Sequence, residues 1–181
     1  MRTKNILLVA IFAALTAIGA MIKIPLIYES ITLQFLFTAL SGMLLGSKSG
    51  ALSQFVYVIL GMFGVPIFTQ GGGIAYILKP TFGYLIGFIF SSYIIGKIIE
   101  SNRQVSFIVL FKASFIGLIV TYVIGVPYLY IILKYISHIH ITIFDSIKIG
   151  CLVFLIGDLL KCFVTAILGV RIIPGIKDMY K

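Results

Sequence analysis

The stretch "NILLVAIFAALTAIGAMI", residues 5–22, decides the class of fold. It contains no charged side chain and ends beside Lys23 and Pro25. A helix that crosses a bilayer needs about 20 mostly apolar residues, so this stretch is predicted to form a first membrane-spanning helix. The apolar runs of the chain are continuous rather than alternating, which argues against a membrane β-barrel.

The composition of the whole chain agrees with this start. Of its 181 residues, 61% are hydrophobic and 10% are charged, and the mean hydropathy is +1.19. Soluble domains carry about 25% charged residues, so residues 1–181 are predicted to form one domain of an integral membrane protein. The net charge of +9 does not indicate nucleic-acid binding, because the Lys and Arg residues lie between apolar spans rather than in one patch.

Five further apolar segments complete the predicted fold, an all-α integral membrane protein with six transmembrane helices. Turns at 46–50 ("GSKSG") and 100–104 ("ESNRQ"), a loop at 66–73 and a less regular stretch at 127–145 separate them. The segments are 30–47, 51–65, 75–99, 105–125 and 147–170.

The basic residues predict the orientation of these helices. Six spans put both termini on one side, and basic residues favour the cytoplasmic side. Placing the N-terminus inside puts nine of the 14 Lys and Arg residues there: Arg2, Lys4, Lys48, Lys97, Arg103, Lys112, Arg171, Lys177 and Lys181. The other five are Lys23, Lys79, Lys134, Lys148 and Lys161. An N-in, C-in topology is therefore predicted, with residues 69–80 at the outer face.

Two charged residues lie inside the sixth predicted helix, in "FLIGDLLKCF", residues 154–163. Asp158 and Lys161 are three residues apart and share one helix face. Each costs about 2.5 to 3.5 kcal/mol at the bilayer centre. They form either a structural ion pair or a carboxylate and an ammonium that face a ligand cavity. We favour the cavity, because a purely structural pair is often no better than apolar packing.

The segment "TQGGGIAYILKPTFGYLIGF", residues 69–88, is predicted to form a lid and a pocket wall on the outer side. Its glycines permit positive φ and close approach of backbone to a ligand. A phosphate-binding GxxxxGK[ST] loop is excluded, because Lys79 precedes Pro80. Lys79 can also extend toward lipid head groups. The candidate ligand-binding residues of this segment are Gly72, Gly73, Tyr76, Lys79, Thr81 and Tyr84.

Two further polar residues, Thr32 and Gln34, stand at the predicted outer start of the second helix. They are candidates for the wall of an outward-facing pocket, since polar groups inside a membrane are commonly functional. Gln54 lies near the opposite end of the bundle and is predicted to pack between helices.

Small residues form one face of the first helix. Ala10, Ala13, Ala14 and Ala17 follow the i, i+3, i+4, i+7 spacing, which lets two helices approach closely in lipid. This face packs either within the chain or against a partner membrane protein.

The cysteines and histidines do not predict a metal site. Cys151 and Cys162 share one span, about 16 Å apart along a helix axis, which is too far for a disulfide. His138 and His140 stand in a predicted outer loop, where a zinc site would need further ligands.

Together these landmarks resemble the biotin-specific S components, the substrate-binding membrane subunits of energy-coupling-factor (ECF) vitamin transporters. The resemblance covers most of the chain, and the glycine-rich stretch and "GDLLK" are specific in combination. Its segments are "ALTAIGAMIKIPL" (14–26), "ITLQ" (31–34), "LLGSKSGALSQFVYVILGMFGVPIF" (44–68), "GGGIAYILKPTFGYLIGF" (71–88), "YVIGVPYLY" (122–130) and "GDLLK" (157–161).

The resemblance implies a multi-pass protein of the bacterial cell membrane that captures biotin at its extracytoplasmic side and is not an enzyme. It implies a transmembrane coupling subunit and two cytoplasmic ATPases as partners, with no cofactor. It gives Asp158 and Lys161 ligand-contacting roles and directs the alanine face toward the coupling subunit.

The chemistry of biotin suits these residues. Its ureido ring offers two N–H donors and one carbonyl, so Asp158 can accept a hydrogen bond while Lys161 donates one or holds Asp158. Glycine-loop N–H groups, Thr32 or Lys79 could receive the carboxylate. The alternatives are an S component for thiamin or riboflavin, an intramembrane enzyme with Asp158 as base, and a small structural subunit.

Overall fold

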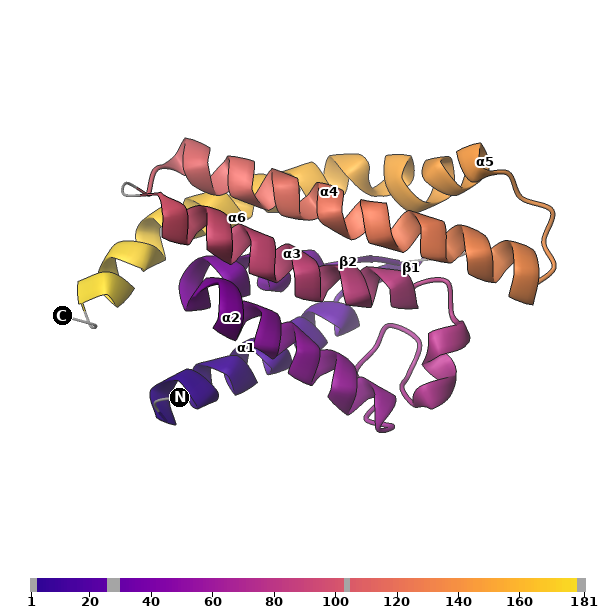
Figure 1. Ribbon diagram of the computed structural model, residues 1–181, viewed down its shortest axis with the longest axis horizontal. Coiled ribbons are helices and arrows are strands. Elements are labelled where there is room, and N and C mark those ends of the chain that lie inside the picture. Colours follow the sequence, from indigo (N-terminus) through magenta and orange to yellow (C-terminus); the bar gives the residue numbers. More distant parts are fainter. Residues whose placement is uncertain (1–2, 26–29, 103–104, 179–181) are drawn as a thin grey trace.

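The computed structural model describes residues 3–25, 30–102 and 105–178, so the predicted inner-side charges Arg2, Arg103 and Lys181 lie outside the described residues. The fold is helical, with a small strand pair (Figure 1). Five helical segments are long and apolar enough to cross a membrane: α1 (Thr3–Met21), α2 (Gln34–Met62), α3 (Phe82–Ser101), α4 (Phe107–Ile131) with its extension η2 (Ile132–Ile136), and α5 (Ile143–Ile147), η3 (Lys148–Leu152) and α6 (Val153–Asp178) in succession.

The helix α2 is folded back on itself at Gly46. This residue has φ 79° and ψ 178°, a backbone conformation that glycine adopts without strain. The Thr38 hydroxyl donates to Gln54 Oε1 at 3.1 Å, whereas residues 16 apart in a straight helix would be about 24 Å apart. The two halves of α2 are therefore antiparallel neighbours, and the turn predicted at 46–50 is a sharp bend at its first residue.

The carboxylate of Glu100, near the end of α3, holds this bend. It accepts from the Ser47 backbone N–H at 2.7 Å and from the Ser47 hydroxyl at 2.9 and 3.0 Å. Ser47 begins the second half of α2, where unpaired N–H groups and the helix dipole favour a negative charge. In Figure 1 the bend lies toward the end of the molecule that carries both termini.

A short antiparallel strand pair joins α1 to α2. The strands β1 (Lys23–Pro25) and β2 (Ser30–Thr32) pair with Lys23 opposite Thr32. The prediction of helix from residue 30 was wrong here, and α2 begins at Gln34. The β-branched Ile31 and Thr32 favour the extended backbone.

The predicted helix 75–99 is interrupted in the structure. Residues Ile74–Leu78 form a short 3₁₀ helix, η1, and α3 begins at Phe82. Lys79 has φ −91° and ψ 141°, because the residue before a proline is disfavoured in the helical region. The break at Lys79 and Pro80 lets the chain turn before α3.

Two predictions about the second half of the chain were also wrong. The helix α4 continues through Pro127 and is extended by the π-helical η2 to Ile136, although residues from 127 onward were expected to be irregular. Local π adjustments allow proline inside such membrane helices. The last helical segment begins at Ile143 rather than near residue 147.

The side-chain amide of Gln54 connects α1, both halves of α2 and, through Ser41, α3. It is fully buried, and its Oε1 accepts from Thr16 at 3.3 Å and from Thr38 at 3.1 Å. Its Nε2 donates to Ser41 at 3.2 Å, and Ser41 pairs with Ser92 of α3 at 2.8 Å. Hydrogen bonds of this kind hold helices together in lipid, and the prediction that Gln54 packs between helices is confirmed.

The predicted alanine face divides into two. Ala13 and Ala17 are buried at 4% and 9% exposure and belong to the core of this chain. Ala10 and Ala14 are exposed. The first two therefore pack within the chain, and only the second two face outward.

Candidate ligand-binding site

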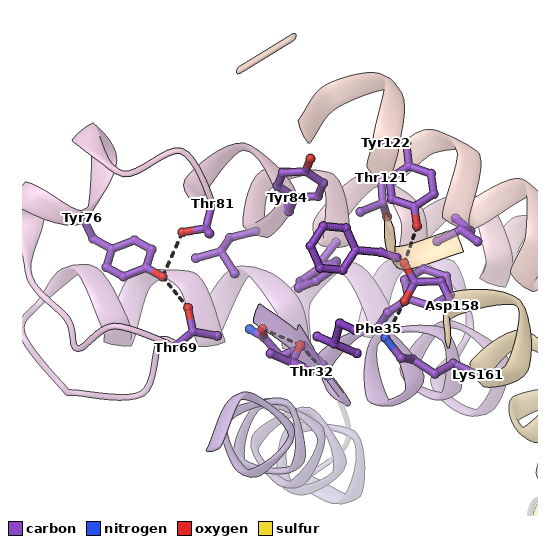
Figure 2. A pocket seen from close by; sticks show the side chains of 16 residues that line it. Thr32, Phe35, Thr69, Tyr76, Thr81, Tyr84, Thr121, Tyr122, Asp158 and Lys161 are labelled. Carbon is purple, nitrogen blue, oxygen red and sulfur yellow. Dashed lines mark hydrogen bonds and ion pairs between the residues drawn. The ribbon is translucent and has the colours of Figure 1, made fainter. Parts of the chain in front are cut away.

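A cavity of about 70 Å³ lies between α2, α3, α4 and α6, beside strand β2 (Figure 2). The polar side chains of its wall come from six separate parts of the chain. They are Thr32, Gln34, Thr69, Tyr76, Thr81, Tyr84, Thr121, Tyr122, Asp158 and Lys161. Its apolar lining consists of Ile31, Phe35, Leu85, Phe88, Leu118 and Phe154. Seven of the ten predicted ligand-binding residues meet here.

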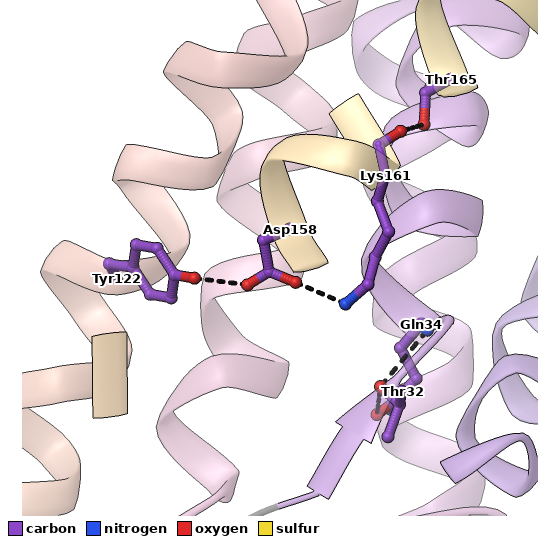
Figure 3. A network of polar contacts seen from close by, with 6 residues as sticks. All are labelled: Thr32, Gln34, Tyr122, Asp158, Lys161 and Thr165. Carbon is purple, nitrogen blue, oxygen red and sulfur yellow. Dashed lines mark hydrogen bonds and ion pairs between the residues drawn. The ribbon is translucent and has the colours of Figure 1, made fainter. Parts of the chain in front are cut away.

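An ion pair forms one end of the cavity. The Lys161 ammonium donates to Asp158 Oδ1, and the Tyr122 hydroxyl of α4 donates to Asp158 Oδ2 (Figure 3). Asp158 and Lys161 are only 7% and 8% exposed. Each carboxylate oxygen therefore has a donor, as a charge in a low-dielectric site requires.

The Thr32 and Gln34 side chains lie beside this pair, at the junction of β2 and α2 (Figure 3). The Thr32 hydroxyl donates to Gln34 Oε1 at 3.0 Å, and Gln34 Nε2 donates to the Tyr57 hydroxyl at 2.8 Å. Tyr57 in turn donates to the Ile67 carbonyl at 3.0 Å. The Gln34 amide is thus fixed from both ends and presents a defined polar edge to the cavity.

Three hydroxyl groups meet at the opposite end of the cavity (Figure 2). The Tyr76 hydroxyl is 2.9 Å from the Thr69 hydroxyl and accepts from Thr81 at 3.0 Å. The Thr69 carbonyl accepts from the Lys23 ammonium of β1. The loop after α2 is therefore fastened both to the start of α3 and to the strand pair.

Tyr84 contributes its ring to the wall. Its hydroxyl donates to the Gly150 carbonyl at 2.7 Å, and the ring packs where an added Cβ at Gly125 would stand 2.5 Å from it. The absence of a side chain at Gly125 therefore allows α4 to approach Tyr84 closely. The hydroxyl ties α3 to the beginning of the last helical segment.

Three predicted ligand-binding residues do not line the cavity: Gly72, Gly73 and Lys79. The Gly73 N–H donates to the Gly61 carbonyl at 2.7 Å, and a Cβ at Gly72 would be 2.2 Å from the Val65 carbonyl oxygen. The glycines therefore shape the loop against the end of α2, and the Gly73 N–H is used within the chain. Lys79 is exposed.

Three further polar residues line the cavity that were not among the predicted ligand-binding residues: Thr69, Thr121 and Tyr122. Tyr122 and Thr121 are adjacent polar residues in an otherwise apolar run, and a polar group at membrane depth was the available indication. Tyr122 forms part of "YVIGVPYLY", but its partner Asp158 lies 36 residues further along the chain.

A metal centre finds no support in the described residues, where no three His, Cys, Asp or Glu side chains cluster. Cys151 and Cys162 are both free thiols, the first partly buried and the second buried. His138 and His140 lie in the connection between η2 and α5.

A buried ion pair at the wall of a partly aromatic cavity, between long apolar helices, is typical of the class of membrane proteins that bind small solutes. Comparison with known proteins identifies the family of this chain. The chain belongs to the BioY family, whose family profile matches residues 1–178.

Named relatives share most of this chain. A protein of Lysinibacillus sphaericus, named probable biotin transporter BioY, is 43% identical over 173 residues, which cover 94% of this chain and 87% of that protein. The biotin transporter BioY of Thermotoga maritima is 35% identical, over 93% of this chain and 95% of its own. These matches confirm the resemblance found from the sequence motifs.

The fold is also found in a crystal structure. The S-component for biotin from an ECF-type ABC transporter superposes with a TM-score of 0.71 and 28% sequence identity, over 94% of this chain and 91% of that chain. The helical architecture described above is therefore that of a known S component.

Proposed function

We propose that this protein captures biotin at the extracytoplasmic side of the bacterial cell membrane, as the substrate-specific S component of an ECF transporter. A transmembrane coupling subunit and two cytoplasmic ATPases complete the transporter, and ATP hydrolysis in those partners drives uptake. The protein is a transport subunit and not an enzyme, and biotin is its cargo rather than a cofactor. The names of its relatives favour biotin over thiamin or riboflavin.

The observation that carries this proposal is the Asp158–Lys161 pair, held by Tyr122 at the wall of a buried cavity. Its carboxylate can accept from the ureido N–H groups of biotin, and the ammonium can donate to the ureido carbonyl. A charged partner roughly doubles the strength of such hydrogen bonds. A ligand that supplies both donors and an acceptor fits this pair of groups.

The other end of the cavity suits the acidic tail of biotin. The hydroxyls of Thr69, Tyr76 and Thr81 meet there, away from the ion pair (Figure 2). Hydroxyl groups rotate and can donate to a carboxylate. We assign the ureido ring to Asp158 and Lys161, and the carboxylate tail to these three hydroxyls. This tail site replaces the glycine loop and Lys79, which the sequence suggested for the carboxylate.

The size of the cavity adds a requirement. Its volume of about 70 Å³ is below the range of roughly 300 to 1,000 Å³ for small-molecule pockets. Biotin binding therefore requires the walls to move apart. Phe35, Phe88 and Phe154 are the aromatic wall side chains without a polar anchor, and because of their size they are the ones we expect to rotate.

The bend in α2 supports a six-crossing topology in a single domain, in which each half of α2 is one crossing. The distribution of basic residues supports placing the N- and C-termini inside. The glycine-rich loop and the connection between η2 and α5 lie at the end opposite the termini (Figure 1), which supports an extracytoplasmic cavity if the termini are inside. The exposed Ala10 and Ala14 are proposed to face the coupling subunit.

Equilibrium binding of labelled biotin to the purified protein tests the function. Asp158→Asn should weaken binding at least about tenfold, because a hydrogen bond to a charged group contributes roughly 1.5–3 kcal/mol. Asp145→Asn is the matched control, since Asp145 lies outside the cavity. Equal affinity in wild type and Asp158→Asn, or displacement of biotin by thiamin or riboflavin, would contradict the proposal.

A further inference from the structure

A second, apolar cavity opens between α4 and the start of the last helical segment. Its volume is about 620 Å³. Val123, Val126 and Ile131 line it along one face of α4, and Ile143 and Ile147 face them from α5. Val123, Ile131, Ile143 and Ile147 are between 40% and 66% exposed. The groove is therefore an open apolar channel on the outside of the bundle.

A third cavity, also of about 620 Å³, continues from the groove at Tyr135, which lines both. Its wall includes Lys134, His138 and His140, all exposed. It lies at the η2–α5 connection, the end of the molecule opposite the termini (Figure 1). This cup therefore gathers basic and hydrogen-bonding side chains where a helix reaches the membrane surface.

One acidic group, Asp145, lies beside the cup, where it is held by Thr142 of the cup wall. The Asp145 carboxylate accepts from the Thr142 hydroxyl at 2.5 Å and the Thr142 N–H at 3.2 Å, as the cap of α5. The Lys134 ammonium lies 5.0 Å from the Tyr130 ring centre and 5.5 Å from that of Tyr135. These two tyrosines both line the groove, so the cation stands at its mouth.

We propose that the groove and the cup form one binding site for an anionic phospholipid. The apolar groove takes an acyl chain, and the cup takes the phosphate of the head group. Two observations carry the assignment: the two cavities share Tyr135 as a wall residue, and their lining changes from apolar side chains to Lys134, His138 and His140 in the order of a lipid's own parts. A neutral imidazole still offers one N–H donor, and lysine binds phosphate as a point charge.

A belt of lysine and tyrosine side chains at the membrane interface, as many membrane proteins have, explains only part of the groove and cup. Lysine and tyrosine near a helix end commonly extend to head groups, and such a belt has no preference for one lipid. It does not account for a hollow of about 620 Å³ that runs deeper along α4. A site with an apolar hollow behind a cationic mouth selects by head-group charge and is filled by a chain.

The site has a structural connection to the ion pair. Tyr122 lines both the groove and the ligand cavity, and its hydroxyl holds Asp158. A bound acyl chain packs behind Tyr122 and keeps its hydroxyl directed at the carboxylate. Lipid occupancy is therefore expected to raise affinity for the cavity's ligand, and this part alone rests on the proposed biotin function.

Native mass spectrometry tests the lipid site directly. The purified protein is exchanged into neutral detergent with equal amounts of phosphatidylglycerol and phosphatidylcholine that carry the same acyl chains. We expect about fivefold preference for retained phosphatidylglycerol, the factor for one basic side chain beside an anionic head group. The combined variant K134Q/H138Q/H140Q should lose the preference, while K79Q, an exposed lysine outside both cavities, should keep it.

A second pair of variants tests the groove. Ile131→Trp fills it and should reduce retention of either lipid, whereas Ile108→Trp, an exposed residue of the same helix outside the groove, should not. Equal retention of the two lipids by wild type, or no effect of Ile131→Trp, would overturn the site. A photoreactive side chain at residue 131 that links to protein rather than lipid in membranes would assign the groove to a partner helix instead.

The connection to the ligand cavity has its own measurement. Biotin affinity should rise several-fold when phosphatidylglycerol is added to delipidated wild type, with no change in Ile131→Trp. Lipid retention without this rise would overturn the connection and leave the lipid site standing. Absence of biotin binding under all conditions would instead contradict the proposed function.

Discussion

The Tyr122 hydroxyl of α4 donates a hydrogen bond to the carboxylate of Asp158 in α6. This contact joins two helices across the wall of the ligand cavity. It occupies the carboxylate oxygen that Lys161 leaves open. Tyr122 therefore decides which directions remain available on Asp158 for a bound solute.

Tyr122→Phe removes this donor and keeps the ring. We expect biotin affinity to fall about tenfold or more, since a hydrogen bond to a charged group contributes roughly 1.5–3 kcal/mol. Equilibrium binding to purified protein measures the change. Tyr93→Phe removes an exposed hydroxyl of α3 and should leave affinity unchanged; equal losses in both variants would exclude a specific role for Tyr122.

Removing one charge of the Asp158–Lys161 ion pair should cost more stability than removing both. Lys161→Met leaves Asp158 buried without its cation, which commonly costs about 3–5 kcal/mol. The double variant Asp158→Asn, Lys161→Met removes both charges and should unfold at a higher temperature than Lys161→Met alone. Thermal unfolding in detergent gives the comparison. A double variant that is less stable than Lys161→Met would contradict the prediction, because it would show that removing the unpaired carboxylate charge brings no relief.

Lys23 should control how long a ligand stays bound. Its ammonium ties strand β1 to the Thr69 carbonyl, next to the hydroxyls that close one end of the cavity. Lys23→Met releases the loop, so dissociation of biotin should be several-fold faster while association changes little. Stopped-flow displacement measures both rates, with Lys79→Met as the control. An unchanged dissociation rate would mean that the loop is held without Lys23.

Glu100 should affect stability but not binding. Its carboxylate caps the second half of α2 through Ser47, far from the cavity. Glu100→Ala should lower unfolding stability by about 1 kcal/mol, the usual contribution of a helix cap. Lys97→Ala, an exposed change one turn earlier in α3, is the control. A loss of biotin affinity in Glu100→Ala would contradict this separation of roles.

The positions of the long helices could be predicted because bilayer thickness fixes the length of an uncharged run. The polar residues inside those runs, Asp158 and Lys161 above all, identified one end of the cavity for the same reason. The structure of residues next to helix breaks was harder to predict. Pro80 ended a helical turn where a continuous helix was expected, while Pro127 stayed within α4, because neighbouring segments decide how each proline is accommodated.

The roles of the glycines depended on contacts that no local pattern contains. Gly72 and Gly73 permit the expected tight loop, but the loop packs onto Gly61 and Val65 at the end of α2 instead of turning its N–H groups into the cavity. The alanine spacing of α1 was similarly ambiguous, since Ala13 and Ala17 satisfy it equally well by packing inside the chain. Tyr122 was missed because its partner is on another helix.

The hydrogen bonds of Gln54 have a consequence for the order of assembly during synthesis. All its partners, and Ser92 beyond them, lie between residues 16 and 92, so this part of the bundle can dock while the ribosome is still making the rest. Asp158 and Lys161 are made last and complete the wall of the cavity on a preformed frame. A nascent chain that is stalled after α3 should therefore resist protease better than the same stalled chain with Thr38→Val, which removes a hydrogen bond to Gln54. Identical protease sensitivity of the two stalled chains would refute this order of assembly.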